Sequence, residues 1–405
     1  MLKRYFLNNK KRNFSTASIW IKGGSDMDST GKKGINKILC SLLTRGCEGF
    51  NNFTLSEYIE SYGAELNQEI FEDGISISIK SLNEHFSKLF PLLDLIINKP
   101  ILSETEFKKV KKSSIDHIKK DKENPFNICF EKWRKIVYSN HPYAFNTIGN
   151  ANDVSKITYE DVLLEFKNFK NREKYLISNN PEINGENFGT LEKKILKEKS
   201  DPLNHNLNTT NRFDYINNDS NQTIIMMGDQ TCSRRSSEYF PLKVLESYLS
   251  YGMSAALFKL FREKHGITYD LGVYYPIRSG NAPFLIYLSV SNDQALFAFE
   301  LLSTLWKNLL FNPLTDAEIF LAKEKLKGSF LLGNQSLDEI LQRKIQLISY
   351  GISPISENDL NSKIEEISSL DILKLTNKYF SKPFLSISGN KNICLEISNR
   401  WKKNF

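Results

Sequence analysis

The sequence repeats one order of landmarks about 200 residues apart, and this repeat constrains the fold more than any other feature. An alternating apolar segment at 18–23 is echoed at 223–228. Each segment is followed by a polar loop and by a helical pattern that ends in glycine, at Gly46 and at Gly252. Glycine suits the left-handed backbone that commonly closes a helix. The chain therefore contains two copies of one supersecondary plan.

The later landmarks of each copy also occur in the same order. An apolar segment at 90–100 and its counterpart at 301–313 both end in proline, which predicts a helix that stops there. Each copy then has a capped helix start followed by a final strand, at 157–163 and 175–178 in the first copy and at 367–373 and 384–387 in the second. Strands precede helical segments in each copy, which predicts an α+β fold of two homologous halves, each a mostly antiparallel sheet covered by helices.

The segment between the copies has a different composition. It is rich in Asn, Asp, Ser and Lys and poor in apolar residues, which is typical of a linker. One short helix is expected in it, around 191–196. The predicted organisation is an N-terminal domain at 1–180, a linker at 181–220 and a C-terminal domain at 221–405.

Composition favours a soluble globular protein over a nucleic-acid-binding or membrane protein. A chain of 405 residues with 40% hydrophobic side chains can bury a sizeable core. Its 54 basic and 47 acidic residues are mixed along the whole length. Nucleic-acid-binding proteins instead gather their basic residues in a patch that contacts the phosphates. The lysine-rich stretch at 108–122 predicts a solvated helix face, with nucleic-acid binding as the alternative. No apolar run approaches the roughly 18 residues that a membrane-spanning helix needs.

The cysteines and the N-terminus bear on the compartment. The five cysteines are odd in number and widely spaced, without a C-x-x-C pair, which favours reduced thiols over disulfides or a cysteine-built zinc site. The first 25 residues are basic, with no acid before Asp26, and resemble an organellar presequence. The strand expected at 17–21 leaves little room for a presequence that is removed. We expect the cytoplasm, with the mitochondrion as the alternative.

The helix expected at 34–46 resembles the helix on which peptidases of the pitrilysin/insulinase family carry an inverted zinc motif, H-x-x-E-H. The surroundings also match: a strand with Trp20, then Gly-Gly-Ser, an acidic loop, Gly34 three residues before the first ligand position, and Gly46 at the end. Mitochondrial processing peptidase and its bacterial relatives belong to this family. The resemblance extends over nearly the whole chain, including the duplication.

The zinc motif itself is degenerate. In active members two His on adjacent turns hold zinc, and the Glu before the second His polarises the attacking water. These three positions are Lys37, Cys40 and Ser41 in this chain. The register of the family's third ligand, a Glu, falls at Asp116 or His117, and one ligand alone cannot complete a site.

A metal held by Cys40 and His117 is the alternative, and we favour ordinary helix residues at both positions. We therefore expect this chain to bind no metal and to carry no catalytic residue of its own.

The second copy keeps a motif of the family. The segment 261–269 resembles the signature R-E-x-x-G-x-x-Y, whose Arg and Tyr help to hold the substrate backbone and the developing oxyanion at the partner's zinc. The resemblance assigns this substrate-binding role to Arg262 and Tyr269. The alternative is that Arg262 is a helix-end cation and Tyr269 an ordinary strand residue. His265 is expected at the surface beside the turn.

Two further segments, 63–70 and 266–273, resemble the family's substrate-side edge strand and its counterpart. An edge strand can capture an extended peptide through its main chain, although an edge that binds nothing fits the residues equally well.

Together these resemblances imply a noncatalytic subunit of a heterodimeric metallopeptidase, inactive alone, with peptide substrates and with zinc on a partner subunit of the same family. A structural subunit of a larger complex and a stand-alone peptide-binding module are the alternatives.

Overall fold

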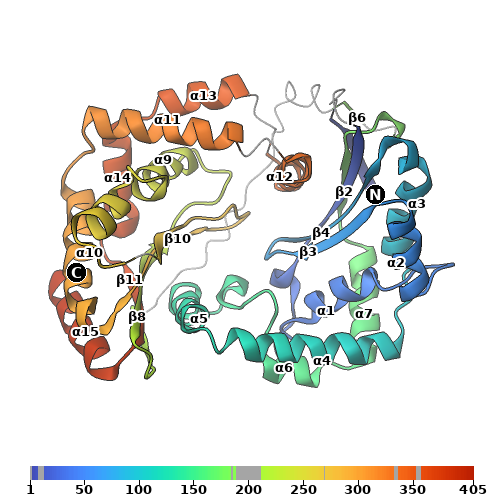
Figure 1. Ribbon diagram of the computed structural model, residues 1–405, viewed down its shortest axis with the longest axis horizontal. Helices are drawn as coiled ribbons and strands as arrows, with labels where there is room; N and C mark the ends of the chain where they lie inside the picture. Colours follow the sequence, from blue (N-terminus) through green and yellow to red (C-terminus); the bar gives the residue numbers. More distant parts are fainter. Residues whose placement is uncertain are drawn as a thin grey trace. The chain divides into compact units, whose positions relative to one another are not determined.

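The computed structural model places the chain in two compact units, and each is made of three separate segments (Figure 1). The first unit contains residues 1–120, 145–199 and 333–355, and the second contains 121–144, 200–332 and 356–405. The residues that the structure describes are 2–7, 13–183, 186–187, 211–268, 270–332, 336–352 and 357–405.

The first unit is built on a six-stranded sheet in the order β3-β4-β2-β5-β1-β6. Strands β2, β3, β4 and β5 pair antiparallel, and β1 pairs parallel with both β5 and β6. The bounds are β1 Leu2–Phe6, β2 Phe14–Lys22, β3 Glu65–Ile70, β4 Gly74–Leu82, β5 Lys174–Ser178 and β6 Glu186–Asn187. Its helices are η1 Ser25–Met27, α1 Ile35–Leu43, α2 Asn52–Ser61, α3 Asn83–Asn98, α4 Glu104–Asp121, α6 Ala151–Lys156, α7 Tyr159–Lys170, η3 Pro181–Ile183 and α12 Leu337–Ser349.

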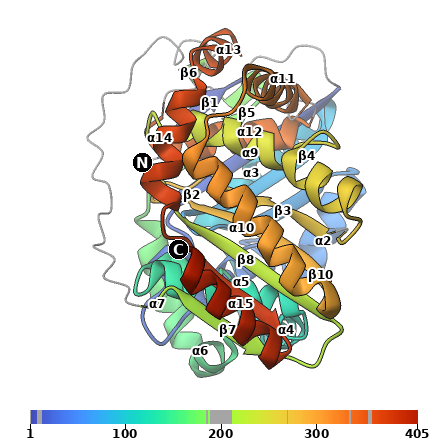
Figure 2. The ribbon, with the colours of Figure 1, turned by 90° about the vertical axis from the view of Figure 1, so that its left-hand side faces the viewer.

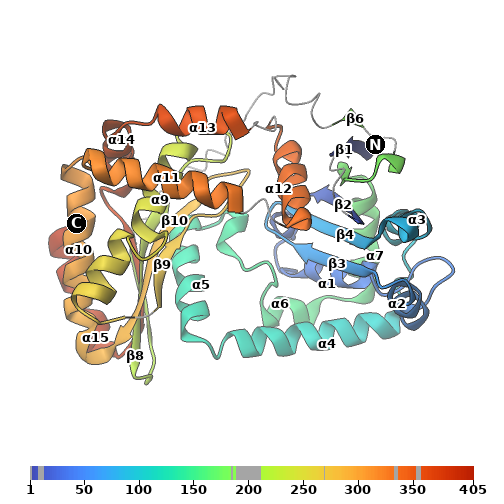
Figure 3. The ribbon, with the colours of Figure 1, turned by 45° about the horizontal axis from the view of Figure 1, so that its top comes forward.

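Alternation along β2 divides its side chains between two cores. Ile19 and Ile21 belong to a large apolar core that they share with residues of α1, α3 and α7. Trp20, between them, belongs to a second core that contains Leu341 and Ile345 of α12. Successive strand residues point to opposite faces. The sheet is therefore covered on both faces, and α12, from far along the chain, lies beside β2 and β5 (Figure 3).

The second unit has a five-stranded sheet in the order β7-β11-β8-β10-β9, antiparallel except for the β7–β11 pair. Its strands are β7 Phe213–Asn217, β8 Gln222–Gln230, β9 Asp270–Tyr274, β10 Pro283–Ser291 and β11 Phe384–Gly389. Its helices are α5 Pro125–Tyr138, η2 Pro142–Ala144, α9 Tyr239–Ser250, η4 Phe258–Lys264, η5 Asn292–Gln294, α10 Ala295–Phe311, α11 Asp316–Leu332, α13 Glu357–Glu365, α14 Ser369–Phe380 and α15 Lys391–Asn404.

Figure 2 looks onto the helices of the second unit, with α10, α14 and α15 in front of the sheet. Helix α5 packs against β7, β8 and β11 on the other face. It is anchored there by polar contacts as well as apolar ones. The Ser386 hydroxyl donates to the Cys129 carbonyl at 3.0 Å, and the Tyr138 hydroxyl donates to the Asn281 carbonyl at 2.9 Å.

The predicted α+β fold with two similar halves is confirmed, together with most of its local landmarks. Helices α7 and α14 both begin with a capping box, made by Thr158 with Asp161 and by Ser368 with Asp371. The final strands β5 and β11 cover the segments predicted for them. Gly252 follows the C-cap of α9 with a φ of 73°, as predicted, whereas α1 is capped by Thr44 and Gly46 lies two residues farther on with a φ of 134°.

The compact units differ from the contiguous domains expected at 1–180 and 221–405. Helix α5 of the first copy belongs to the second unit, and α12 of the second copy belongs to the first unit, because each covers a sheet face that the other copy leaves open. The segment predicted as a linker contains β6 and β7, so it is not a plain linker. The helix expected around 191–196 lies outside the described residues.

Two other features concern the cysteines and the membrane-spanning potential of the helices. All five cysteines are free and buried. Within the described part of the chain, we find no helix long and apolar enough to cross a membrane.

Candidate functional site

The degenerate zinc motif lies on helix α1, and a buried aspartate organises the start of this helix. Asp28 accepts hydrogen bonds from the backbone N–H of Gly34 at 2.6 Å and of Asn36 at 3.1 Å. Because the first N–H groups of a helix have no partner within it, a carboxylate there stabilises the helix. Gly34 has a φ of 101°, and an added Cβ would lie 2.7 Å from the Ile148 carbonyl oxygen. The position therefore requires glycine.

The three motif positions do not fit a zinc ion. Lys37, at the first ligand position, is a cation, and Ser41, at the second, offers a hydroxyl, which is not among zinc's usual N, S and carboxylate ligands. Cys40 occupies the position of the water-polarising Glu, and its side chain is 0% exposed. Burial raises the pKa of the Cys40 thiol to about 12, so it is neutral near pH 7. A neutral buried thiol is neither a general base nor a zinc ligand.

The third-ligand register lies on α4. Asp116 and His117 are both exposed, whereas Phe107, Val110 and Ile118 of the same helix point into the core. Across the ranges that the structure describes, no group of three or more His, Cys, Asp or Glu side chains could hold a metal ion. The alternative of a metal held by Cys40 and His117 gains no support from a fully buried thiol and an exposed imidazole.

The loop between β2 and α1 contains two acids with raised pKa values. Burial raises the pKa of Asp26 to about 7, and the nearby Asp73 adds to the effect. Burial likewise raises the pKa of Asp28 to about 6. Arg172 opposes the rise at Asp26, but its guanidinium is also paired with Glu165. The sequence did not identify this loop, or the start of α1, as a site. Its acidic composition was the one signal that pointed to it.

The second motif begins on η4, a π-helical segment that ends at Lys264. Arg262 is exposed, its guanidinium lies 5.0 Å from the centre of the Phe258 ring, and its carbonyl accepts from the N–H of Gly266 at 3.1 Å. His265 is half-buried, against the Phe297 ring. Tyr269 lies outside the described residues. The structure therefore places Arg262 at a helix end with its side chain accessible, and both interpretations of this residue stay open.

Each of the two segments expected as edge strands contains one edge strand of a sheet, β3 in the first unit and β9 in the second. In the described part of the chain, β3 pairs only with β4, and β9 pairs only with β10. Strand β3 is mostly exposed, with only Ile70 buried. Each edge therefore presents backbone N–H and C=O groups to which an extended peptide could pair.

Comparison with known proteins decides the family. Residues 4–151 match the family model described as insulinase (peptidase family M16), and residues 182–326 match the model described as peptidase M16 inactive domain. The chain belongs to peptidase family M16.

Several known proteins are similar to the chain over most of its length. An uncharacterized zinc protease of Rickettsia felis is 23% identical over 89% of the chain and 88% of its own length. The uncharacterized zinc protease YmxG of Bacillus subtilis is 22% identical, over 96% and 99%. The beta subunit of mitochondrial-processing peptidase of Saccharomyces cerevisiae is 21% identical, over 95% and 88%.

Solved structures confirm the M16 fold. A protease from Helicobacter pylori superposes with a TM-score of 0.82 at 16% identity, covering 95% of this chain and 96% of its own. A peptidase M16 inactive domain from Pseudomonas fluorescens gives a TM-score of 0.80 at 20% identity, covering 96% and 95%. At such identities the likeness concerns the fold alone.

Proposed function

We propose that this chain is the noncatalytic subunit of a two-chain M16 peptidase and contributes substrate contacts to a zinc-bearing partner of the same family. The observation that carries the proposal is the complete burial of Cys40 beside Lys37 and Ser41 on α1. This helix keeps the family's position and its glycine start, but it has no group that could hold or activate a metal-bound water. In the proposed complex, zinc on the partner would supply the activated water.

The substrate contacts proposed for this chain are Arg262, Tyr269 and the edge strands β3 and β9. Arg262 is exposed, so its guanidinium is accessible to a ligand. A guanidinium offers a fixed fork of donors, which suits a peptide carbonyl that is gaining negative charge. The outer edges of β3 and β9, which pair with no further strand among the described residues, support the binding of an extended peptide or a short unfolded segment. We place the complex in the cytoplasm, with the mitochondrion as the alternative.

The experiment compares variants in the reconstituted pair, after a zinc-motif partner has been recovered by affinity capture of this chain. Arg262→Ala should leave the heterodimer assembled and lower kcat/KM roughly a hundredfold, because loss of one oxyanion donor typically costs on the order of 3 kcal/mol. Tyr269→Phe should act in the same direction. Arg400→Ala, at an arginine held by Glu300 and Glu396 on another part of the second unit, is the control and should leave kcat/KM unchanged.

The alternatives make different predictions in the same assay. If this chain is only a structural subunit, both Arg262→Ala and Tyr269→Phe turn over peptide at the wild-type rate in an assembled complex. If it is a stand-alone peptide-binding module, affinity capture recovers no zinc-bearing M16 subunit, and the isolated chain binds peptides by itself.

A further inference from the structure

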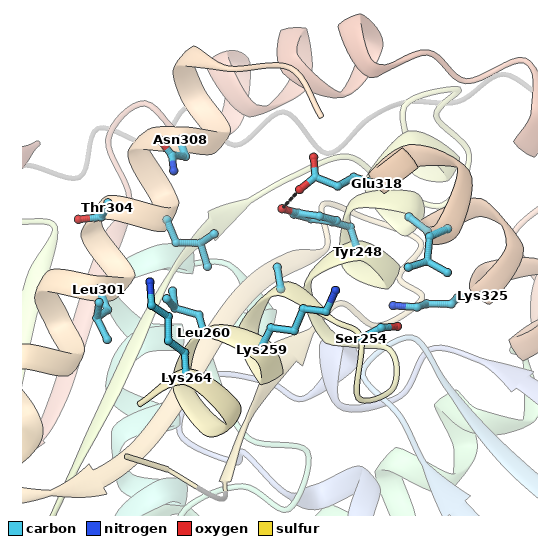
Figure 4. A pocket seen from close by; sticks show the side chains of 14 residues that line it. Tyr248, Ser254, Lys259, Leu260, Lys264, Leu301, Thr304, Asn308, Glu318 and Lys325 are labelled. Atoms are coloured by element: carbon cyan, nitrogen blue, oxygen red, sulfur yellow. Dashed lines mark hydrogen bonds between the residues drawn. The ribbon is translucent and has the colours of Figure 1, made fainter. Parts of the chain in front are cut away.

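A pocket of about 380 Å³ lies among the helices of the second unit (Figure 4). It shares η4 with Arg262, but Arg262 does not line it. Its volume is in the range that small ligands occupy, roughly 300–1,000 Å³. Helix α9, the segment that follows it, η4, α10 and α11 all contribute side chains to its wall.

The wall of the pocket has an apolar part and a cationic part. Leucines from three elements form the apolar part: Leu260 of η4, Leu301 and Leu305 of α10, and Leu321 of α11. Lysines form the cationic part: Lys259 and Lys264 of η4 and Lys325 of α11. In Figure 4 the amino groups of Lys259 and Lys325 point toward each other. Such a combination suits a ligand with an apolar body and a negative group.

The protein balances the positive charge of the pocket only in part, because three lysines share its wall with a single acid, Glu318, which interacts electrostatically with Lys259. Glu318 is the one acid in the wall, and it is occupied by hydrogen bonds from the Tyr248 hydroxyl at 3.0 Å and the Thr315 N–H at 2.9 Å. Among the described residues, none of the three lysines forms an ion pair. Burial and the charge of Lys259 lower the pKa of Lys325. Two facing ammonium groups that repel each other are stabilised by an anion between them.

The π-helical geometry of η4 brings two of the lysines to the pocket together. A π-helix forms i→i+5 hydrogen bonds, so Lys259 and Lys264 lie about one turn apart on one face. In an α-helix of 3.6 residues per turn, residues five apart point in different directions. Short π-helical segments within proteins are frequently found at functional sites.

We propose that this pocket binds a small organic anion with an apolar chain, whose carboxylate or phosphate group lies between Lys259 and Lys325 and whose chain packs on the leucines. The proposal goes beyond the proposed function, because it concerns neither zinc nor peptide cleavage, and Arg262 of the same segment does not line the pocket.

Isothermal titration of the full-length chain with octanoate and with octyl phosphate tests the proposal and distinguishes the two anionic groups. At least one of them should bind saturably. Acetate and inorganic phosphate, which lack the chain, and 1-octanol, which lacks the charge, should each bind at least tenfold more weakly. Lys325→Met, which keeps the apolar stem and removes the charge, should weaken binding about tenfold, or about 1.4 kcal/mol. Lys325→Arg should retain binding.

Lys402→Met is the matched control, because Lys402 is an exposed lysine of α15 that does not line the pocket, and its affinity should equal that of the wild type. If Lys325→Met does not fold, Lys259→Met provides the same test from an exposed position. The proposal is overturned if neither octanoate nor octyl phosphate binds the folded wild-type chain. It is also overturned if 1-octanol binds as tightly as the anions, or if the folded lysine variants bind like the wild type.

Discussion

Replacing Asp26 by asparagine should stabilise the first unit at alkaline pH. Asp26 accepts a hydrogen bond from the Gly24 N–H at 2.7 Å, and the side-chain oxygen of asparagine can keep that bond. The substitution removes a charge that is costly to bury close to Asp73. Since the folded chain holds the Asp26 proton with a pKa of about 7, against 3.8 ordinarily, the native state binds this proton more tightly than the unfolded state does.

The sign of the pH dependence follows from that difference. The stability contributed by Asp26 is fully present below pH 3.8 and is lost as the pH rises through about 7. At about 1.4 kcal/mol for each pKa unit, the full loss is about 4 kcal/mol, and we take about 2 kcal/mol because solvent reaches part of the side chain. Asp26→Asn should therefore raise the free energy of unfolding by about 2 kcal/mol at pH 8 and by about 1 kcal/mol less at pH 5.

Urea unfolding is carried out at pH 5 and pH 8 and is monitored by hydrogen–deuterium exchange of peptides from β2 and β4. These peptides report the stability of the first unit alone. Asp94→Asn is the control, because Asp94 is an exposed aspartate of the same unit, and it should change stability by less than about 0.5 kcal/mol at either pH. An equal effect of Asp26→Asn at both pH values, or destabilisation at pH 8, would refute the reasoning.

Two other predictions test the packing of α12 and the degenerate motif. Leu341→Ala should destabilise the first unit by about 2–5 kcal/mol in the same exchange experiment, because Leu341 is 0% exposed in the core beside Trp20. Leu164→Ala, at an exposed leucine of α7, is the control and should cost less than about 0.5 kcal/mol. A small effect of Leu341→Ala would contradict the assignment of α12 to the first unit. The triple variant Lys37→His, Cys40→Glu, Ser41→His should recover no strong peptidase activity. Position 40 is fully buried, and the third-ligand position on α4 holds Asp116 or His117 in place of Glu. Strong peptide turnover by the purified variant would contradict this prediction.

Local signals in the sequence were sufficient for much of the fold. The capping boxes at Thr158 and Ser368, and the glycine that follows the cap of α9, depend on residues a few positions apart, so a single chain reveals them. Strand β7 was missed because the polar composition around it masked the apolar residues Phe213 and Ile216.

The exchange of α5 and α12 between the units could not be predicted in the same way. The apolar stripe of α12, with Leu337, Leu341, Ile345 and Ile348, indicates that one face is buried. It does not indicate which sheet covers that face, because hydrophobic burial is not directional.

The sequence predicted which residues occupy the candidate site, but it did not predict how buried they are. The resemblance to the M16 zinc helix located Lys37, Cys40 and Ser41, but the complete burial of Cys40 depends on packing that only the fold supplies. The pocket in the second unit had no sequence signal. Lys259 and Lys325 are far apart in the chain. The sequence does not reveal the π-helical geometry that places Lys264 on the same wall of the pocket.

The central claim is that this chain is a zinc-less M16 subunit that acts with a zinc-bearing partner. Elemental analysis of the isolated chain and of the affinity-captured complex tests it most directly. We predict no stoichiometric zinc in the isolated chain and about one zinc per two-chain complex, since a closed or catalytic zinc site needs three or four protein ligands. About one tightly held zinc in the isolated chain would contradict the account.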